Sequence, residues 1–269
     1  MKYEPIKKSL GKVFNKNPYL RIFFYKLLNL LLLRAWHIKR ELKRIRKTIG
    51  IDASVLDAGS GFGQYTYYMS TLSENWNITG VDIMLEQMED CTSFFRKLGC
   101  SHRVGFEMAD LSKFVRPNEY NLILSVDVME HIEDDVQVFK NFHKSLISNG
   151  ILLISTPSDQ GGSDVHNEHD KSFIAEHVRD GYNTNDIEEK LKSAGFSKVQ
   201  TKFTYGLPGK ISWKLSMKYP IILLNSSKLF FIILPFYYLV TFPFCIVFNF
   251  FDLIGNHKTG TGLMVKAWK

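Results

Sequence analysis

The feature that most constrains this sequence is an alternation, between residues 51 and 206, of short apolar runs with amphipathic helical stretches. Nearly continuous apolar runs are typical of strands that are covered on both faces. The expected strands are Ser54–Asp57, Ile78–Asp82, Val104–Met108, Asn121–Val126 and Ile151–Ser155, and the expected helices include Glu86–Leu98, Asp134–Leu146 and Asn185–Ala194. Strands that alternate with helices predict an α/β fold, in which crossover helices connect the strands of a parallel sheet.

The composition is compatible with a full hydrophobic core. Of the 269 residues, 45% are hydrophobic, which favours one large α/β domain with additions, or two small domains, over a disordered chain. Cys91, Cys100 and Cys245 lie far apart and lack the paired spacing of zinc ligands, so we expect neither a zinc site nor a disulfide framework. The apolar run Leu27–Leu33 is short and is followed by basic residues, so we expect no signal peptide.

Positive charge is concentrated at the N-terminal end of the chain. Residues 1–50 carry fourteen Lys or Arg residues against Glu4 and Glu41, a net charge of +12 in a chain whose total is +7. The remainder is therefore mildly acidic. Such a basic helical arm favours contact with an anionic membrane surface or with a nucleic acid. A solvated helix face would explain the same charges without any partner.

A glycine-rich loop closes the first expected strand and opens a helix. Gly59, Gly61 and Gly63 follow the strand that ends at Asp57. Glycines at such a turn permit close approach of the backbone to a ligand at a helix N-terminus. A dinucleotide-binding fingerprint would place its third glycine at position 64, which is Gln64 in this chain. The loop therefore predicts a ligand site of a different kind.

Acidic residues also stand at the ends of the second and third expected strands, where Asp82 and Asp110 are found. The carboxyl ends of successive parallel strands meet at one edge of the sheet, which is where open α/β sheets bind ligands. A carboxylate at such a position accepts strong hydrogen bonds from paired hydroxyl groups. Each acid taken alone would also suit a helix N-cap.

With these three features in place, the chain resembles the class I S-adenosylmethionine-dependent methyltransferases, and especially the small-molecule type 11 methyltransferase domains. The resemblance covers roughly residues 50–206 and resumes at the last strand. It implies a Rossmann-like seven-stranded sheet with helices on both faces. In this family strands six and seven form an antiparallel pair, which places them at Ser197–Tyr205 and Gly262–Trp268.

The resemblance also implies a cofactor site for S-adenosyl-L-methionine. In the family the glycine loop surrounds the methionine part, the acid after strand two holds the ribose hydroxyls, and the acid after strand three binds the adenine amino group. The expected cofactor-binding residues are Asp57, Gly59, Ser60, Gly61, Gly63, Gln64, Asp82, Ile83, Met84, Asp110, Leu111, Ser125 and Asp127.

Two histidines are candidate catalytic bases. His131 follows the fourth strand in the segment Asp127-Val128-Met129-Glu130-His131, and His177 lies in a polar region after the fifth strand. A neutral imidazole beside the methyl acceptor could take a hydroxyl proton. A structural or surface role would fit either histidine equally well. Some quinone-type relatives associate a divalent cation with a segment of this kind, but the acids here are fewer, so we expect no metal.

Residues 207–258 form an apolar insertion between the last two strands. From residue 229 to residue 251 there is no charged side chain, a length that would suit a transmembrane helix. A single crossing would separate the last strand from its sheet. We therefore expect a re-entrant or interfacial helical hairpin, a lid, or a dimer interface. Pro235 and Pro243 are expected to break any straight helix in this segment.

The domain organisation that follows has three parts: a basic arm at 1–50, a methyltransferase domain at 51–206 and 259–269, and the apolar insertion at 207–258. We expect a cytoplasmic enzyme, peripherally associated with the inner face of a membrane, that methylates an oxygen or carbon of a lipophilic small molecule such as a quinone, phenolic lipid or polyene. The alternatives are an RNA methyltransferase that uses the arm on phosphates, and a non-catalytic scaffold. The Asn/Asp-Pro-Pro-aromatic motif of many nucleic-acid enzymes is absent after the fourth strand, so a nucleic acid is the less favoured partner.

Overall fold

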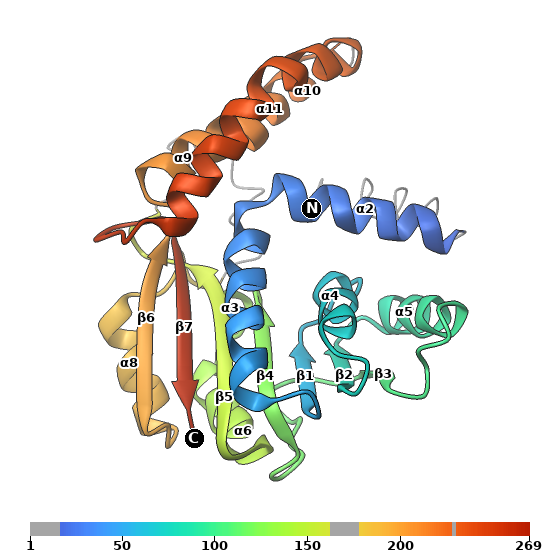
Figure 1. Ribbon diagram of the computed structural model, residues 1–269. Helices are drawn as coiled ribbons and strands as arrows, with labels where there is room; N and C mark the ends of the chain where they lie inside the picture. The colour runs from blue at the N-terminus through green and yellow to red at the C-terminus, as the bar shows by residue number, and fades with distance from the viewer. Residues whose placement is uncertain (1–16, 162–177, 228–229) are drawn as a thin grey trace.

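Seven strands form one mixed sheet in the order β3-β2-β1-β4-β5-β7-β6 (Figure 1). The computed structural model describes residues 17–161, 178–227 and 230–269. The strands are β1 (Ser54–Ala58), β2 (Asn77–Asp82), β3 (Val104–Met108), β4 (Tyr120–Val126), β5 (Leu146–Pro157), β6 (Lys198–Thr204) and β7 (Gly262–Trp268). The pairs along β3-β2-β1-β4-β5 are parallel, and β7 is antiparallel to both of its neighbours, β5 and β6. The predicted sheet, including its antiparallel end, is confirmed.

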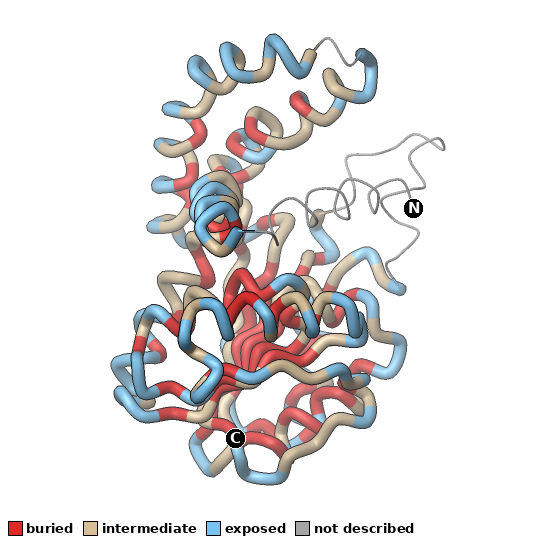
Figure 2. Tube along the Cα trace, turned by 90° about the vertical axis from the view of Figure 1, so that its right-hand side faces the viewer, coloured by how far each residue is buried: buried red, intermediate tan, exposed pale blue. Residues whose placement is uncertain are grey.

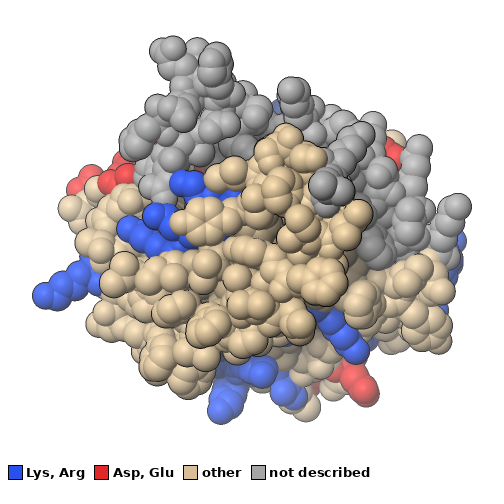
Figure 3. Space-filling model, turned by 90° about the horizontal axis from the view of Figure 1, so that it is seen from above, with Lys and Arg blue, Asp and Glu red and all other residues tan. Residues whose placement is uncertain are grey.

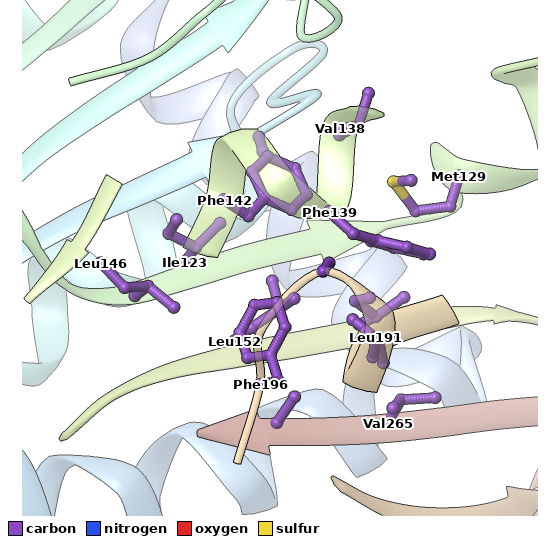
Figure 4. Packing of buried hydrophobic residues seen from close by; sticks show 14 of the residues in the cluster. Ile123, Met129, Val138, Phe139, Phe142, Leu146, Leu152, Leu191, Phe196 and Val265 are labelled. Carbon is purple, nitrogen blue, oxygen red and sulfur yellow. The ribbon is translucent and has the colours of Figure 1, made fainter. Parts of the chain in front are cut away.

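Helices cover both faces of the sheet (Figure 1). The helices are α2 (Pro18–Leu31), α3 (Leu33–Ile49), α4 (Gln64–Leu72), α5 (Leu85–Lys97), α6 (Asp135–Ser145) and α8 (Thr184–Ser193). Buried residues of α6 and α8, among them Phe139, Phe142 and Leu191, pack on one face of the central strands (Figure 4). Buried residues of α3, α4 and α5 form a second core on the opposite face.

The basic N-terminal region is partly an integral layer of the domain. Asn17 accepts a hydrogen bond from the amide of Tyr19, and Pro18 occupies the first turn of α2, where its missing amide costs nothing. The chain becomes extended at Leu32, and α3 then turns Ile38 and Leu42 into the core. The basic residues of α3 therefore lie on the outer side of a helix whose inner side packs in the core.

The apolar insertion folds as a helical hairpin that projects from the domain (Figures 1 and 2). It consists of α9 (Leu207–Trp213), a π-helical turn η3 (Lys214–Lys218), α10 (Tyr219–Ser226) and α11 (Phe230–Ile254). Within the described residues, α11 is the single helix long and apolar enough to cross a membrane, judged by length and composition only. Only 6% of the residues in the most apolar stretch of α11 are buried. Because β7 returns to the sheet after α11, the hairpin leaves and rejoins the domain at the same end.

The two prolines inside α11 do not interrupt this helix. Helix α11 runs through both Pro235 and Pro243, so the expectation that they would break a straight helix was wrong. Each proline removes only one amide donor from the helix. Between them, the hydroxyls of Tyr237 and Tyr238 donate to the carbonyls of Leu215 and Ser216, which holds this part of α11 against η3.

A buried carboxylate at the end of α11 joins the hairpin to the domain. Asp252 is fully buried, and its Oδ1 lies 2.9 Å from His37 Nε2 on α3. The same side chain accepts the amide of Tyr205 at 3.2 Å and the amide of Gly209 at 3.0 Å. Burial alone would raise the pKa of Asp252, but the hydrogen bond and charge of His37 hold it below its usual range.

Replacing Asp252 with alanine should destabilise the fold by about 3–5 kcal/mol, because three buried donors would lose their acceptor. Asp252→Asn keeps one oxygen acceptor and should cost less. Chemical denaturation of the full-length chain, followed by circular dichroism, measures both free energies of unfolding. An alanine variant as stable as the wild type would show that Asp252 does not anchor the hairpin.

Candidate cofactor and methyl-transfer site

The glycine loop after β1 adopts backbone conformations that side chains disfavour. Gly59, Gly61 and Gly63 have φ angles of +78°, +51° and +78°, all in the left-handed region. A Cβ atom at Gly59 would lie 2.2 Å from a methyl carbon of Val128. The loop therefore packs directly on the segment that follows β4, and glycine is required at position 59 for space as well as for conformation.

Asp82 at the end of β2 connects two loops. Its Oδ2 accepts the amide of Gly61 at 2.9 Å, and its Oδ1 accepts the amide of Met84 at 3.1 Å. Beside the carboxylate, Ile83 is 68% exposed and Met84 is 41% exposed. A carboxylate next to exposed apolar side chains suits a ligand in which a sugar with two hydroxyls is attached to an aromatic base.

Asp110 lies beyond the end of β3, on the same edge of the sheet. It is exposed, and its Oδ1 accepts the amide of Ser112 at 2.9 Å. Hydrogen bonds from Ser112 hold the pKa of Asp110 below its usual range, so this group is a carboxylate at neutral pH. Because β3, β2 and β1 are neighbours, Asp110, Asp82 and the glycine loop stand at three successive strand ends.

Other predicted cofactor residues have partners within the protein. Leu111 is buried in the core, and its carbonyl accepts a hydrogen bond from the Asn141 side chain of α6 at 2.9 Å. Gln64 donates to Asn29 of α2 at 2.8 Å. Ser60 is buried with its hydroxyl 3.8 Å from the sulfur of Met88. Asp57 is buried and accepts the hydroxyl of Thr66 at 2.5 Å.

Helix α2 lies over the tip of the glycine loop. Arg21 donates to the carbonyl of Phe62 at 2.6 Å, and the hydroxyl of Tyr25 donates to the same oxygen. The rings of Phe24 and Tyr25 lie 6.1 and 5.7 Å from the ring of Phe62. This contact was not predicted. The spacing of Arg21 and Tyr25, four residues apart, places them on one face of a helix, but nothing in the sequence indicates what that face contacts.

A guanidinium from α3 reaches the end of β4. Arg34 forms an ion pair with Asp127, a non-glycine residue with a φ of +51°, and the hydroxyl of Tyr205 accepts the Arg34 amide at 3.0 Å. Tyr65 and Glu130 also contribute to the electrostatic environment of the Arg34 guanidinium. We refer to these five residues as the arginine–acid cluster. Arg34 was missed because in the sequence it follows an apolar run and reads as one more charge of the basic arm.

Glu130 occupies the most enclosed position in the cluster. Its side chain is 1% exposed and accepts the hydroxyl of Thr156 at 3.0 Å. Two carboxylates, those of Asp127 and Glu130, therefore share one nearby guanidinium. Three buried polar atoms of this region, Arg34 Nε and the hydroxyls of Tyr65 and Ser125, lack a hydrogen-bond partner within the described residues.

The structure describes only one of the two candidate bases. His131 is exposed at the end of the short 3-10 turn η1 (Met129–His131), next to Glu130. His177 lies outside the described residues. Across residues 17–161, 178–227 and 230–269, no group of three or more His, Cys, Asp or Glu side chains is arranged to hold a metal ion.

Comparison with known proteins agrees with this arrangement. A family model described as a methyltransferase domain matches residues 50–207. The chain is 32% identical over 149 residues to phosphoethanolamine N-methyltransferase 1 of Zea mays, covering 54% of this chain and 28% of the maize protein. It is 25% identical over 178 residues to the ubiquinone biosynthesis O-methyltransferase of Rickettsia conorii, covering 60% of this chain and 57% of that protein.

Solved structures share the fold. Phosphoethanolamine N-methyltransferase 2 of Haemonchus contortus, in complex with S-adenosyl-L-methionine, matches 86% of this chain and 52% of its own with a TM-score of 0.60 at 19% identity. A putative sarcosine dimethylglycine methyltransferase of Galdieria sulphuraria matches 87% of this chain and 85% of its own with a TM-score of 0.58 at 16% identity.

The sheet order, the glycine loop and the acids at the strand ends are those of a class I methyltransferase domain. Since the family model covers more than half of the sequence, the chain belongs to the methyltransferase-domain family. The aligned region spans only 28% of the maize relative, so the relatives' substrates do not carry over directly.

The residues present fit S-adenosylmethionine. Gly59, Gly61 and Gly63 hold the loop in a left-handed backbone conformation and carry no side chains that would keep a ligand from its backbone. The Arg34 guanidinium and the Tyr65 hydroxyl interact with each other and suit an amino-acid carboxylate, and the excess of carboxylates at Asp127 and Glu130 suits an ammonium group. The cluster could therefore hold both charges of the methionine end, while Asp82 could hold the ribose.

Replacing Asp82 with alanine should weaken binding of S-adenosylhomocysteine by about 2–3 kcal/mol, the loss of two charge-assisted hydrogen bonds. The amides of Gly61 and Met84 would also lose their acceptor. Calorimetry on the wild type and the variant gives the two affinities, and thermal unfolding without ligand shows whether the fold is intact. Equal affinities would rule out ribose binding by Asp82.

Asp57 should make stability depend on pH. Burial raises its pKa to about 7, against the opposing hydrogen bonds from Thr66. Between pH 4 and 7 the folded protein then keeps a proton that the unfolded chain releases, so stability falls as pH rises, by at most about 4 kcal/mol. Asp57→Asn cannot titrate and should lack this component. Urea unfolding of both proteins without cofactor across this range tests it. Parallel pH profiles would contradict the shift.

Proposed function

We propose that this protein transfers a methyl group from S-adenosylmethionine to an oxygen or carbon of a lipophilic small molecule at a membrane surface. The observation that carries the proposal is the position of Tyr205. Its hydroxyl accepts the Arg34 amide, and its own amide donates to Asp252 of α11. The arginine–acid cluster is therefore connected through a single residue to the base of the apolar hairpin.

The chemistry requires orientation and the exclusion of water rather than a covalent protein nucleophile. The cofactor supplies an already activated methyl group on a sulfonium. The protein must keep the acceptor atom in line with that methyl at contact distance. We propose that Asp57, Asp82, Asp110, Asp127 and the glycine loop hold the cofactor, and that α2, closed over Phe62, limits access of water to the loop.

Proton removal from a hydroxyl acceptor is assigned to His131 or His177. His131 adjoins Glu130 of the arginine–acid cluster and is exposed, so it could exchange a proton with solvent once the acceptor is bound. A carbon acceptor would need a base at a later step of the reaction, and the same histidines could serve.

Membrane association is part of the proposal. Helix α11 exposes large apolar side chains along its whole length, from Phe231 to Ile254, and α2 exposes Tyr19 and Phe23. Seen from above, a broad uncharged surface has Lys and Arg side chains around parts of its border (Figure 3). A hairpin that returns to its own sheet would dock without crossing. We place the protein in the cytoplasm, peripherally on the inner face of a membrane.

A second candidate acceptor is an amine of the ethanolamine type. The two carboxylates of the arginine–acid cluster would attract a cationic amine. The maize relative is named a phosphoethanolamine N-methyltransferase, which suits the amine acceptor. The Rickettsia relative is named a ubiquinone biosynthesis O-methyltransferase, which suits the lipophilic acceptor.

Incubation of the full-length protein with methyl-labelled cofactor and a membrane lipid extract tests the proposal. We expect label in the organic phase, in a quinone, phenol or polyene fraction, and its loss in the Asp82→Ala variant. Label in a water-soluble or phospholipid amine would favour the second candidate. Cofactor binding without transfer to any fraction would contradict methyl transfer to a lipophilic acceptor.

A further inference from the structure

A basic groove runs along the outer face of α3 at the foot of the hairpin. Its volume is about 450 Å³, and it is lined by Trp36, Lys39, Arg40, Lys43, Arg44 and Lys47, with Leu253 of α11 contributing a wall. The five cations recur at positions that share one side of a helix, over roughly two turns. The groove is therefore a continuous strip of positive charge rather than a scatter of surface lysines.

Among the described residues, acidic side chains neutralise this strip only in part. Arg44 pairs with Glu41 at 2.5 Å, but Glu41 also pairs with Lys266 at 2.7 Å. Lys43 and Lys47 are exposed and form no ion pair among the described residues. Like charges held this close repel one another unless an anion lies between them. Burial and the charge of Lys43 lower the pKa of Lys39, as this crowding implies.

The groove also borders apolar surface. Arg40 donates to the carbonyl of Leu253, which fixes the end of α11 against the strip. Just beyond, Phe250, Phe251 and Ile254 are more than half exposed. The indole of Trp36 lies in the groove itself, with its Nε1 donating to the carbonyl of Leu30 at 3.1 Å. A ligand that filled this region would need an anionic head next to a hydrocarbon part.

We propose that the α3 groove is a binding site for the phosphate-bearing headgroup of an anionic phospholipid. A nucleic acid would use the cations but would leave the adjoining Phe250, Phe251 and Ile254 surface in water, whereas a lipid uses both. The site rests on the proposed membrane docking and is independent of methyl transfer. It would fix the orientation of the docked protein, because the headgroup site and the hairpin are joined through Leu253.

The experiment measures flotation of the full-length protein with vesicles of phosphatidylcholine alone and of phosphatidylcholine with phosphatidylglycerol. The variant is Lys43→Gln with Lys47→Gln. Each lysine close to an anionic surface contributes about a factor of five in affinity, so the pair should lower binding to the anionic vesicles roughly 30-fold. Binding to neutral vesicles, which depends on the apolar hairpin, should not change.

The chain offers a matched control in Lys140→Gln with Lys144→Gln. These exposed lysines have the same spacing but lie on α6, which covers the opposite face of the sheet. The control should keep the anionic-vesicle binding of the wild type. An equal loss in both double variants would reduce the effect to net charge and overturn the site, as would full anionic binding by the α3 variant.

A parallel measurement of binding to an RNA duplex distinguishes a phospholipid headgroup from a nucleic acid as the source of the phosphate. RNA binding that depends on Lys43 and Lys47, together with unchanged vesicle binding in the variant, would overturn the lipid assignment. Calorimetry with S-adenosylhomocysteine should give one affinity for all three proteins. Failure of methyl transfer would leave these results standing, and loss of the vesicle effect would leave the cofactor site untouched, so the two failures are distinguishable.

Discussion

The arrangement of α3 and the hairpin helices depends on the hydrogen bonds that the carboxylate of Asp252 accepts. This carboxylate is buried between α3, the end of β6 and α9, and it accepts hydrogen bonds from all three. An ionised group in such a place is stable only while its partners remain. Burial lowers the pKa of His37, and Asp252 acts to raise it. The hydrogen bonds of Asp252 join α3, α9 and the end of β6 to α11.

Shared contacts also hold the loops at the edge of the sheet where the glycine loop and Asp82 lie. Gly59 fits against Val128, and Asp82 accepts the amide of Gly61, so the loops after β1, β2 and β4 constrain one another. The unusual backbone of Asp127, with a φ of +51°, persists where Arg34 holds its side chain. The arrangement is therefore largely formed before any ligand arrives, which favours tight and oriented binding.

Much of this architecture could be predicted from the sequence because its signals are local. Apolar runs located the first five strands, with errors of a few residues, and the family resemblance placed the last two. Strand β5 begins at Leu146 rather than Ile151 because Leu146 pairs with Tyr120 ahead of an irregularity in the ladder. The contacts of Arg34, Tyr205 and Asp252 join residues far apart in sequence, and no spacing rule indicates them. The prolines of α11 were misjudged because tertiary packing, through Tyr237 and Tyr238, outweighed a local preference.

One face of α2 contacts the glycine loop, and the opposite face exposes apolar side chains. Its inner face holds the carbonyl of Phe62 through Arg21 and Tyr25, and its outer face presents Tyr19, Phe23 and Leu27 to the surroundings. If the cofactor lies against the glycine loop as proposed, a movement of α2 away from Phe62 would uncover this loop. Whatever covers the outer face of α2 would then also affect how easily this helix moves, and movements of this kind limit turnover in many enzymes.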